Sequence, residues 1–361
     1  MDGIDAALVK LGERRCTVMQ TLASPYPDEL RETLIRFSQA PGELSIDDFG
    51  QLDRAVGEAF RDAALELLSL AKVAAKDIQA IGSHGQTLRH RPDGRYPFTL
   101  QIGDPNVIAS GTGITTVADF RRRDVALGGE GAPLAPAFHR WLFAEPGRSR
   151  IILNLGGIAN VTLLPAADEP VIGFDTGPAN SLMDAWIREA RGERFDAGGA
   201  WAASGTVDHS LLEAMLADPY FAAPAPKSTG FEYFNFDWLK AHLDAKKELS
   251  AADVQATLLE LTVTTIRDAI IDHTPDLQEV LVCGGGASND ALMARLANCL
   301  DPVSVSSTAA VGLDPDWVEA AAFAWLASRT LAGQAGNLPS VTGASEAQVL
   351  GGIYPGIASD S

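Results

Sequence analysis

Three glycine-rich segments, each following a run of apolar residues, constrain this chain more than any other feature. They are NLGGIAN at 154–160, FDTGPAN at 174–180 and CGGGASN at 283–289. Glycine lets backbone N–H groups approach an anion closely, and a helix that begins after the turn adds a favourable dipole. One such turn alone is more often a plain tight turn, because glycine tolerates positive φ. Three of them in one chain favour a phosphate and nucleotide site.

None of the three turns matches a Walker A loop or the GxGxxG fingerprint, so P-loop and Rossmann folds are disfavoured. Apolar spacing predicts helices over 53–72 and 253–273, the second a long amphipathic helix. Short apolar runs before each turn predict strands, which indicates α/β layers with ligands at the strand ends. The segment RIILNLGGIANVTLL predicts a hairpin, and therefore a mixed sheet rather than a purely parallel one.

At 361 residues, the chain is long enough for two domains. Glycine and proline cluster in LGGEGAPLAP at 127–136, which predicts a boundary there. We expect domain I to comprise residues 1–128 plus about 338–361, and domain II residues 129–337. The C-terminal segment SVTGASEAQVLGGIYPG is too short for a domain and is expected to pack on domain I.

The chain is strongly acidic, with 28 basic and 47 acidic residues and a net charge of −19. Such a field repels phosphate backbones and anionic lipids, so we expect neither nucleic-acid nor membrane partners. The three cysteines lack metal-ligand spacing and an even count, so neither a disulfide framework nor a zinc site is implied, and a reducing cytoplasm fits best. No apolar stretch approaches the roughly 18 residues of a membrane span.

Asp175 is the strongest candidate for a general base. It follows the apolar run VIGF and precedes the predicted helix SLMDAW, where a ligand-facing carboxylate would project. An equally good alternative is that Asp175 or Asn180 only caps this helix.

Two polar segments in the first half of the chain are further candidates. In GSHGQTLRH, Gln86 suits recognition of sugar hydroxyls, because its amide both donates and accepts, whereas His84 is more often a structural hydrogen-bonding group in such a loop. In DFRRRD, Asp119 and Arg121 follow the predicted strand TTVA, and the guanidinium suits a carboxylate substrate. A solvated charge run is the alternative for this second segment.

Several long segments together resemble one family. GSHGQTLRHRP, QIGDPNVIA, VADFRRRDVALGGEGAPLAPAFH, NLGGIANV, FDTGPANSLMDAW and VCGGGASNDALM, in this order, resemble the anhydro-N-acetylmuramic acid kinase family over nearly the whole chain. The resemblance implies a two-domain actin-like ATPase (ribonuclease-H-like) fold with mixed sheets, in which ATP occupies an interdomain cleft.

The resemblance also implies an activity. Such enzymes use ATP, Mg²⁺ and water to open 1,6-anhydro-N-acetylmuramic acid and to phosphorylate O6, giving N-acetylmuramic acid 6-phosphate in cell-wall (murein) recycling. It implies a small-molecule amino sugar and ATP as partners, a homodimer, and Asp175 as the base that activates water. Two alternatives remain at this point: an inactive ATP- or sugar-binding pseudokinase, and another sugar kinase of the same superfamily.

The family's functional residues transfer onto matching positions of this chain. The expected nucleotide-binding residues are Gly156, Gly157, Asn160, Gly284, Gly285, Gly286 and Asn289, with Lys227 a looser assignment. The expected substrate-binding residues are Gln86, Asp119, Arg121 and Asn180. Two departures from the family pattern are Phe231, where arginine is expected, and Glu130, where glutamine is commoner.

The opening MDGID coincides with the tail of the family's first phosphate loop, so Asp2, Gly3 and Asp5 are expected beside the nucleotide, with Asp2 the nearest carboxylate for Mg²⁺. The Gly-Thr-Ser part of that loop and its strand do not precede it here. We therefore expect this chain to be catalytically impaired relative to a chain carrying the whole loop.

Overall fold

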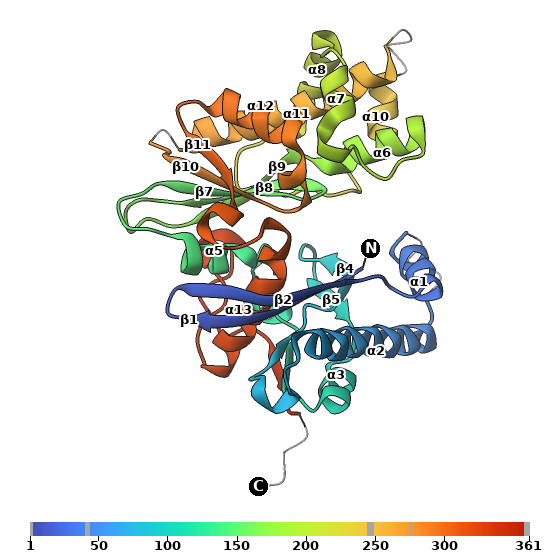
Figure 1. The fold of residues 1–361 in the computed structure, drawn as a ribbon, viewed down its shortest axis with the longest axis vertical. Coiled ribbons are helices and arrows are strands. Elements are labelled where there is room, and N and C mark those ends of the chain that lie inside the picture. Colours follow the sequence, from blue (N-terminus) through green and yellow to red (C-terminus); the bar gives the residue numbers. More distant parts are fainter. Residues whose placement is uncertain (1–2, 40–43, 244–248, 275, 357–361) are drawn as a thin grey trace. The chain divides into compact units, whose positions relative to one another are not determined.

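A computed structural model describes residues 3–39, 44–243, 249–274 and 276–356. These residues divide into two compact units (Figure 1). Unit 1 holds the described residues up to Leu142 and from Trp317 onward, and unit 2 holds Phe143–Asp316. Each unit combines helices with strands, which confirms the predicted mixed α/β organisation in two parts.

Unit 1 contains strands that form two hairpins and one small sheet. The strands are β1 (Ile4–Gly12), β2 (Arg15–Ser24), β3 (Ile81–Gly82), β4 (Gln86–Arg91), β5 (Phe98–Ile102), β6 (Thr116–Ala118) and β12 (Gly352–Tyr354). The helices are α1 (Asp28–Gln39), α2 (Ile46–Ala71), α3 (Pro105–Thr112), α4 (Arg122–Ala126), α5 (Ala135–Phe143), α13 (Val318–Leu331) and α14 (Pro339–Thr342), with the 3-10 helix η2 (Ala75–Asp77), and the 3-10 helix η6 (Pro315–Trp317) falls at the division between the units. β1 pairs with β2 and β4 with β5, both antiparallel, and the three-stranded sheet has the order β12-β6-β3.

The C-terminal segment returns to unit 1, as expected from the sequence. β12 pairs antiparallel with β6. The fully buried Asp124 carboxylate fixes the segment before β12, because it accepts hydrogen bonds from the Asn337 side chain (2.7 Å) and the Thr342 hydroxyl (2.7 Å). It also accepts the N–H of Gly131 at 2.8 Å, so one carboxylate joins the glycine-rich 128–131 loop to the C-terminal segment.

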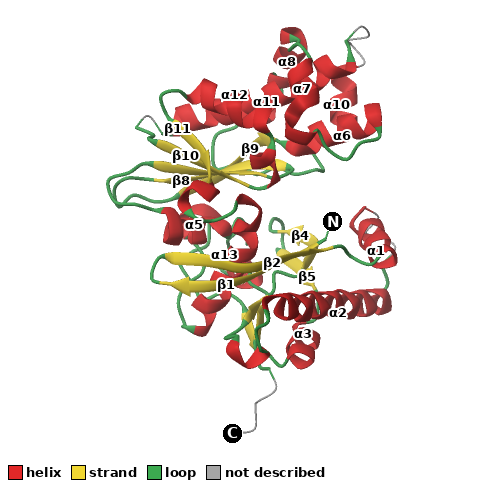
Figure 2. Cartoon of the chain, viewed as in Figure 1, coloured by secondary structure: helices red, strands yellow, loops and turns green. Residues whose placement is uncertain are grey.

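Unit 2 is built on one five-stranded sheet, which Figure 2 shows as a single yellow layer. Its strands are β7 (Arg150–Leu155), β8 (Ile158–Leu164), β9 (Ile172–Pro178), β10 (Glu279–Cys283) and β11 (Ser304–Ser307). Its α-helices are α6 (Asn180–Arg191), α7 (Ala200–Ser204), α8 (His209–Leu216), α9 (Pro219–Ala222), α10 (Phe236–Leu243), α11 (Ala251–His273) and α12 (Asp290–Leu300). Its 3-10 helices are η3 (Ala197–Gly199), η4 (Gly285–Ser288) and η5 (Thr308–Val311).

The sheet of unit 2 has the order β11-β10-β7-β8-β9, with β7 at its centre. β10 pairs in parallel with β7 and with β11, whereas β8 pairs antiparallel with both β7 and β9. The mixed sheet predicted from the 150–164 hairpin is therefore confirmed.

Helix α11 differs from the expected amphipathic helix. It is buried along most of its length, from Val254 to Ile266, because it packs against β9 and is also in contact with α6, α7, α8 and α12. Figure 1 shows α11 and α12 on one side of the sheet. Leu261, Val263 and Ile266 are fully buried in the core of this unit with Leu153 and Val161 of the sheet. A helix covered on several sides needs apolar residues all round, not on one stripe.

The division between the units falls at different residues from those expected. Helices α5 and α13 belong to unit 1, whereas the expected boundaries at 128/129 and about 338 placed them in domain II. Aromatic packing explains the difference, because Trp325 of α13 lies 5.8 Å from Trp141 and 6.0 Å from Phe138 of α5, centroid to centroid. Such packing depends on tertiary contacts that glycine and proline spacing does not encode.

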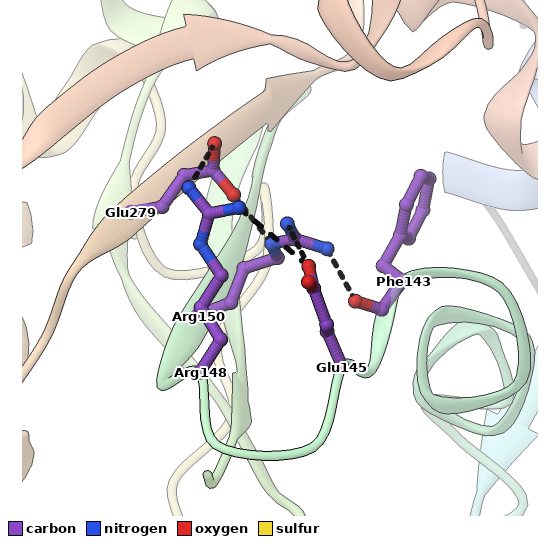
Figure 3. Close-up of polar contacts among 5 residues, drawn as sticks. All are labelled: Phe143, Glu145, Arg148, Arg150 and Glu279. Carbon is purple, nitrogen blue, oxygen red and sulfur yellow. Dashed lines mark hydrogen bonds and ion pairs between the residues drawn. The ribbon is translucent and has the colours of Figure 1, made fainter.

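An ion cluster fixes the amino ends of β7 and β10 (Figure 3). The buried Arg150 guanidinium pairs with Glu279 on the adjacent strand at 2.5 Å and with Glu145 at 3.3 Å. It also donates to the Phe143 carbonyl, and Arg148 pairs with Glu279 at 3.4 Å. The cluster therefore ties the segment that enters unit 2 to the two central strands.

We predict that Arg150→Met destabilises the protein by about 3 kcal/mol, because it leaves the buried Glu279 carboxylate without its closest partner. The matched control is Arg54→Met, which breaks the exposed Arg54–Glu58 pair on α2 and should cost less than about 1 kcal/mol. Urea unfolding measures both free energies, and equal losses would show that the cluster is no more stabilising than a surface pair.

Candidate functional site

All three glycine-rich segments of the sequence reach one edge of the unit 2 sheet. The second differs from the expected turn, because Gly177 and Pro178 belong to β9 and only Ala179 separates this strand from α6. β7 and β10 are parallel, and Cys283 at the end of β10 pairs with Asn154 near the end of β7. β9 runs parallel to β7, since each is antiparallel to β8 between them. The turns after β7, β9 and β10 therefore share the carboxyl edge, where α/β sheets bind ligands.

A row of polar residues crosses the sheet just before this edge. Cys283, Asn154, Asn160 and Asp175 occupy paired positions on β10, β7, β8 and β9. Paired residues on adjacent strands project from the same face, so the two carboxamides lie in line with the Asp175 carboxylate. Asn154 was not among the residues singled out from the sequence. Its place in the row depends on strand register, and the only local signal is its position two residues before Gly156.

Asp175 is held by contacts with the segment 220–229. Its N–H donates to the Lys227 carbonyl at 2.9 Å, and its carbonyl accepts the Tyr220 hydroxyl at 2.7 Å. Its Oδ2 accepts the N–H of Thr229 at 2.9 Å. This backbone donor fixes the orientation of the carboxylate.

The capping alternative for Asp175 and Asn180 is wrong. Helix α6 begins at Asn180, its N-cap residue is Ala179, and no side chain caps it. Asp175 lies within β9 instead, three residues before the strand ends. The Asn180 side chain donates to the Leu155 carbonyl at 3.1 Å, so it connects the start of α6 with the end of β7.

Backbone hydrogen bonds join the first two glycine turns. The carbonyl of Gly157 accepts the N–H groups of Ala179 (2.9 Å) and Ser181 (3.1 Å), and the carbonyl of Gly156 accepts the N–H of Asn180 (3.1 Å). The carbonyls of the hairpin tip thus accept hydrogen bonds from the first N–H groups of α6, which lack partners within the helix.

The third turn approaches the end of β7 closely. Gly284 has φ +81°, and a Cβ there would lie 2.5 Å from Asn154 Oδ1 and 2.9 Å from the Leu155 carbonyl oxygen. A Cβ on Gly286 would lie 2.6 Å from the Leu155 Cβ and 3.3 Å from the Asn180 amide nitrogen. The structure therefore brings the three predicted turns together around Leu155.

Two predicted nucleotide-side residues have structural partners. Asn289 is buried and caps α12, since its Oδ1 accepts the Leu292 N–H at 3.0 Å. The Lys227 ammonium donates to the carbonyls of Tyr220 (2.9 Å) and Phe221 (3.1 Å) and lies 4.6 Å from the Tyr220 ring centroid. Burial lowers the pKa of Lys227. This lysine thereby secures the segment that holds Asp175.

Phe231, the departure from the family pattern, lies against the first turn. Its ring occupies the space that a Cβ on Gly157 would need, although 64% of the residue is exposed. Only glycine fits under this ring without displacing it.

The other predicted substrate residues lie in unit 1. Arg121 donates to His84 Nε2 from Nε (3.0 Å), and its Nη1 donates to the Gly131 carbonyl at 2.8 Å. Burial lowers the pKa of Arg121, and burial with the adjacent guanidinium lowers the pKa of His84 to about 3. His84 is thus a neutral acceptor, which confirms its expected structural role.

Gln86 and Asp119 each lie two residues from a member of the His84–Arg121 pair in the sequence. Asp119 follows β6 and has a φ of 61°, a backbone conformation that residues other than glycine rarely adopt. Burial raises its pKa, and Arg122 approaches its Oδ2 at 3.4 Å. Gln86 begins β4, rather than lying in a loop, and its Oε1 accepts the Tyr26 hydroxyl at 3.3 Å.

The start of the chain is described from Gly3. A Cβ on Gly3 would lie 2.7 Å from the Ser24 carbonyl oxygen. Asp5 lies in β1, and burial, together with the charge of Asp5, raises the pKa of Tyr26. Asp2 lies outside the described residues. Within the described part of the chain, no three His, Cys, Asp or Glu side chains form a group that could hold a metal ion.

The fold and the site together define an α/β protein with a mixed sheet, whose carboxyl edge presents three glycine turns beside an oriented carboxylate. Among the described residues, no helix is long and apolar enough to span a membrane. A protein family model described as anhydro-N-acetylmuramic acid kinase matches residues 1–356.

Curated relatives agree with the family model. The anhydro-N-acetylmuramic acid kinase of Xanthomonas campestris pv. campestris (strain 8004) is 55% identical over 357 residues, which cover 98% of this chain and 94% of the relative. The Coxiella burnetii (strain Dugway 5J108-111) protein of the same name is 51% identical over 357 residues, which cover 99% of this chain and 95% of that relative. The chain belongs to the anhydro-N-acetylmuramic acid kinase family.

One similar solved structure is component A of (R)-2-hydroxyglutaryl-CoA dehydratase from Acidaminococcus fermentans. It is 9% identical, with a TM-score of 0.44 over 88% of this chain and 96% of that one.

We predict that Gly284→Ala destabilises unit 2 by about 1–3 kcal/mol more than Gly312→Ala does. Both glycines have positive φ, but a Cβ on Gly312 meets nothing within 4 Å, so the comparison isolates the close approach to β7. Denaturant unfolding of both variants measures the difference. Equal losses would mean that the turn relaxes away from Leu155.

We also predict that acid weakens the fold through its buried histidines. Burial lowers the pKa of His84 and of His139 to about 3, from an ordinary value of 6.5. Between these pH values the unfolded chain binds protons that the folded chain does not. Stability therefore falls as pH decreases through this window, by up to about 1.4 kcal/mol per pH unit for each histidine.

The variant that checks this is His84→Gln, whose amide oxygen still accepts from Arg121 but does not titrate. Its unfolding free energy should depend less steeply on pH between 6 and 4 than that of the unaltered chain. The exposed His209→Gln is the control and should leave the slope unchanged. Identical slopes for all three proteins would contradict the assignment of a neutral, buried His84.

Proposed function

We propose that this protein phosphorylates 1,6-anhydro-N-acetylmuramic acid with ATP while opening its anhydro bridge, giving N-acetylmuramic acid 6-phosphate and ADP. Membership of the family supports the substrate and the reaction. The observation that carries the proposal is the position of Asp175, whose carboxylate is oriented at the edge where the three glycine turns converge.

The reaction needs a base that removes a proton from the attacking water molecule. Asp175 takes a proton from water as the water oxygen attacks the anomeric carbon, from the side opposite the bridging oxygen, as in an inverting glycosidase. The bond between the anomeric carbon and O6 breaks, and O6 takes the γ-phosphoryl group. The Thr229 N–H keeps the Asp175 carboxylate in one orientation during this step.

The glycine turns suit the nucleotide. We assign Gly156, Gly157 and Asn160 to the phosphates and Gly284, Gly285, Gly286 and Asn289 to the side of the adenosine, with Gly3, Asp5 and, more loosely, Lys227. Backbone N–H groups at turns beside the start of a helix bind phosphate oxygens without a counter-charge from the side chains. A Cβ on Gly285 meets nothing within 4 Å, so this turn is open to a ligand.

The remaining assignments complete the proposal. Gln86, Asp119, Arg121 and Asn180 would bind the amino sugar. Mg²⁺ would neutralise phosphate charge and be held largely by ATP and water. Asp2 remains the suggested protein ligand, and we propose a cytoplasmic homodimer.

The two other functions have specific tests. A pseudokinase would bind ATP without releasing ADP, and another sugar kinase would turn over glucose, glycerol or N-acetylglucosamine. Family membership over nearly the whole chain favours neither.

We predict that Asp175→Asn lowers ADP release with 1,6-anhydro-N-acetylmuramic acid by about 10²–10⁴-fold, because the amide cannot accept the proton of water. Nucleotide affinity should change little, since the glycine turns are intact. The control is Asp237→Asn, an exposed carboxylate on α10 that should keep full activity. Undiminished turnover in Asp175→Asn would remove this residue as the base.

A further inference from the structure

A cavity lies within unit 1, lined by none of the residues assigned above. Its volume is about 380 Å³. The hairpin turn between β1 and β2, helices α5 and α13, and the segment 335–347 provide its walls. The lining residues are Arg14, Ala137, Arg140, Trp141, Trp325, Arg329, Ala335, Asn337, Leu338 and Ala347.

Two indole rings are part of the apolar lining of the cavity. The ring centroids of Trp141 and Trp325 are 5.8 Å apart, with the planes tilted by 33°. Phe138 supports both rings, at 5.7 Å from Trp141 and 6.0 Å from Trp325.

Three guanidinium groups and no acidic side chain line the same cavity. The chain has a net charge of −19, so a pocket whose charged residues are all positive differs from the negative potential of the protein as a whole. Arg14 and Arg140 are exposed, and Arg329 is half-buried. Guanidinium groups bind phosphate oxygens through paired N–H donors and also stack on aromatic rings.

Arg329 is held in place with donor capacity remaining. Its Nε donates to the Ala335 carbonyl at 3.1 Å, its Nη1 donates to Gln334 Oε1 at 2.5 Å, and its guanidinium carbon lies 5.4 Å from the Trp325 ring centroid. Its Nη2 donates to none of the residues that the structure describes. Burial lowers the pKa of Arg329, yet a guanidinium keeps its charge at neutral pH.

The floor of the cavity is also rigid. The buried Asn337 donates to Asp124 at 2.7 Å and to the Glu346 carbonyl at 3.2 Å, and its Oδ1 accepts the Gln348 N–H at 2.7 Å. A site already held in shape does not lose conformational entropy when a ligand binds.

We propose that this cavity binds a small molecule that carries one ring and one phosphate group. The ring would lie on the indoles, and the phosphate would take the guanidinium donors. The volume is near the lower end of the range of ligand sites, which suits a molecule of one or two rings. Sugar phosphates and nucleoside monophosphates share this chemistry, and the proposal does not depend on the reaction at Asp175.

The test is titration of tryptophan fluorescence, supported by calorimetry, with N-acetylmuramic acid 6-phosphate, adenosine monophosphate and inorganic phosphate as separate probes. The variant is Arg140→Gln, and the matched control is Arg188→Gln, an exposed arginine on α6 of unit 2 with the same charge change. Ring-bearing phosphates should bind at least 10-fold more weakly to Arg140→Gln, because a charge-assisted hydrogen bond is lost. Arg188→Gln should match the unaltered protein.

The probes distinguish the two sources of ligand. Tighter binding of the sugar phosphate or of the nucleotide identifies which one the cavity takes, and inorganic phosphate should bind more weakly than either. If Arg140→Gln fails to fold, Arg14→Gln tests the same prediction from the hairpin. Equal affinity of the unaltered protein and both folded arginine variants, or no binding up to about 10 mM, the range of very weak ligands, would overturn the proposal.

Discussion

The parallel pairing of β7 with β10 is the constraint on which unit 2 depends. At one end of the pair, the Arg150–Glu279 ion pair fixes the register and ties in the segment at Phe143. At the other end, the same register places Cys283 opposite Asn154. A shift of one residue would turn every side chain of β10 to the opposite face of the sheet. The third glycine turn would then lose its fit against Leu155, so the ion cluster and the candidate site are linked through two strands.

Two buried charged side chains of unit 1 are satisfied by specific, distant partners. Asp124 accepts from three donors, and two of these belong to the C-terminal segment. Arg121 donates to His84 and to Gly131. In a low dielectric such contacts are strong when complete and costly when one member is missing. They therefore define the positions of the loops around the predicted substrate residues more sharply than apolar packing does.

Local sequence signals predicted the elements well and their limits less well. The helix expected at 53–72 begins earlier, at Ile46, because Ser45 and Asp48 form a capping box. The helix expected at 253–273 matches α11 closely, but its burial on several sides comes from neighbouring helices. The domain boundary differed for a related reason, since Trp141 and Trp325 hold α5 and α13 together across a long separation in sequence.

The sequence by itself determined the mixed α/β class, the three glycine-rich segments, and Asp175 on an apolar strand, because these depend on spacing and on residue type within a short window. Only the tertiary structure decided that Asn154 lies in line with Asp175 and that the Lys227 ammonium is bound to two carbonyls. It alone assembled the arginine- and tryptophan-lined cavity from three separate parts of the chain. The physical reason is that strand register and helix packing bring together residues whose local sequences carry no information about one another.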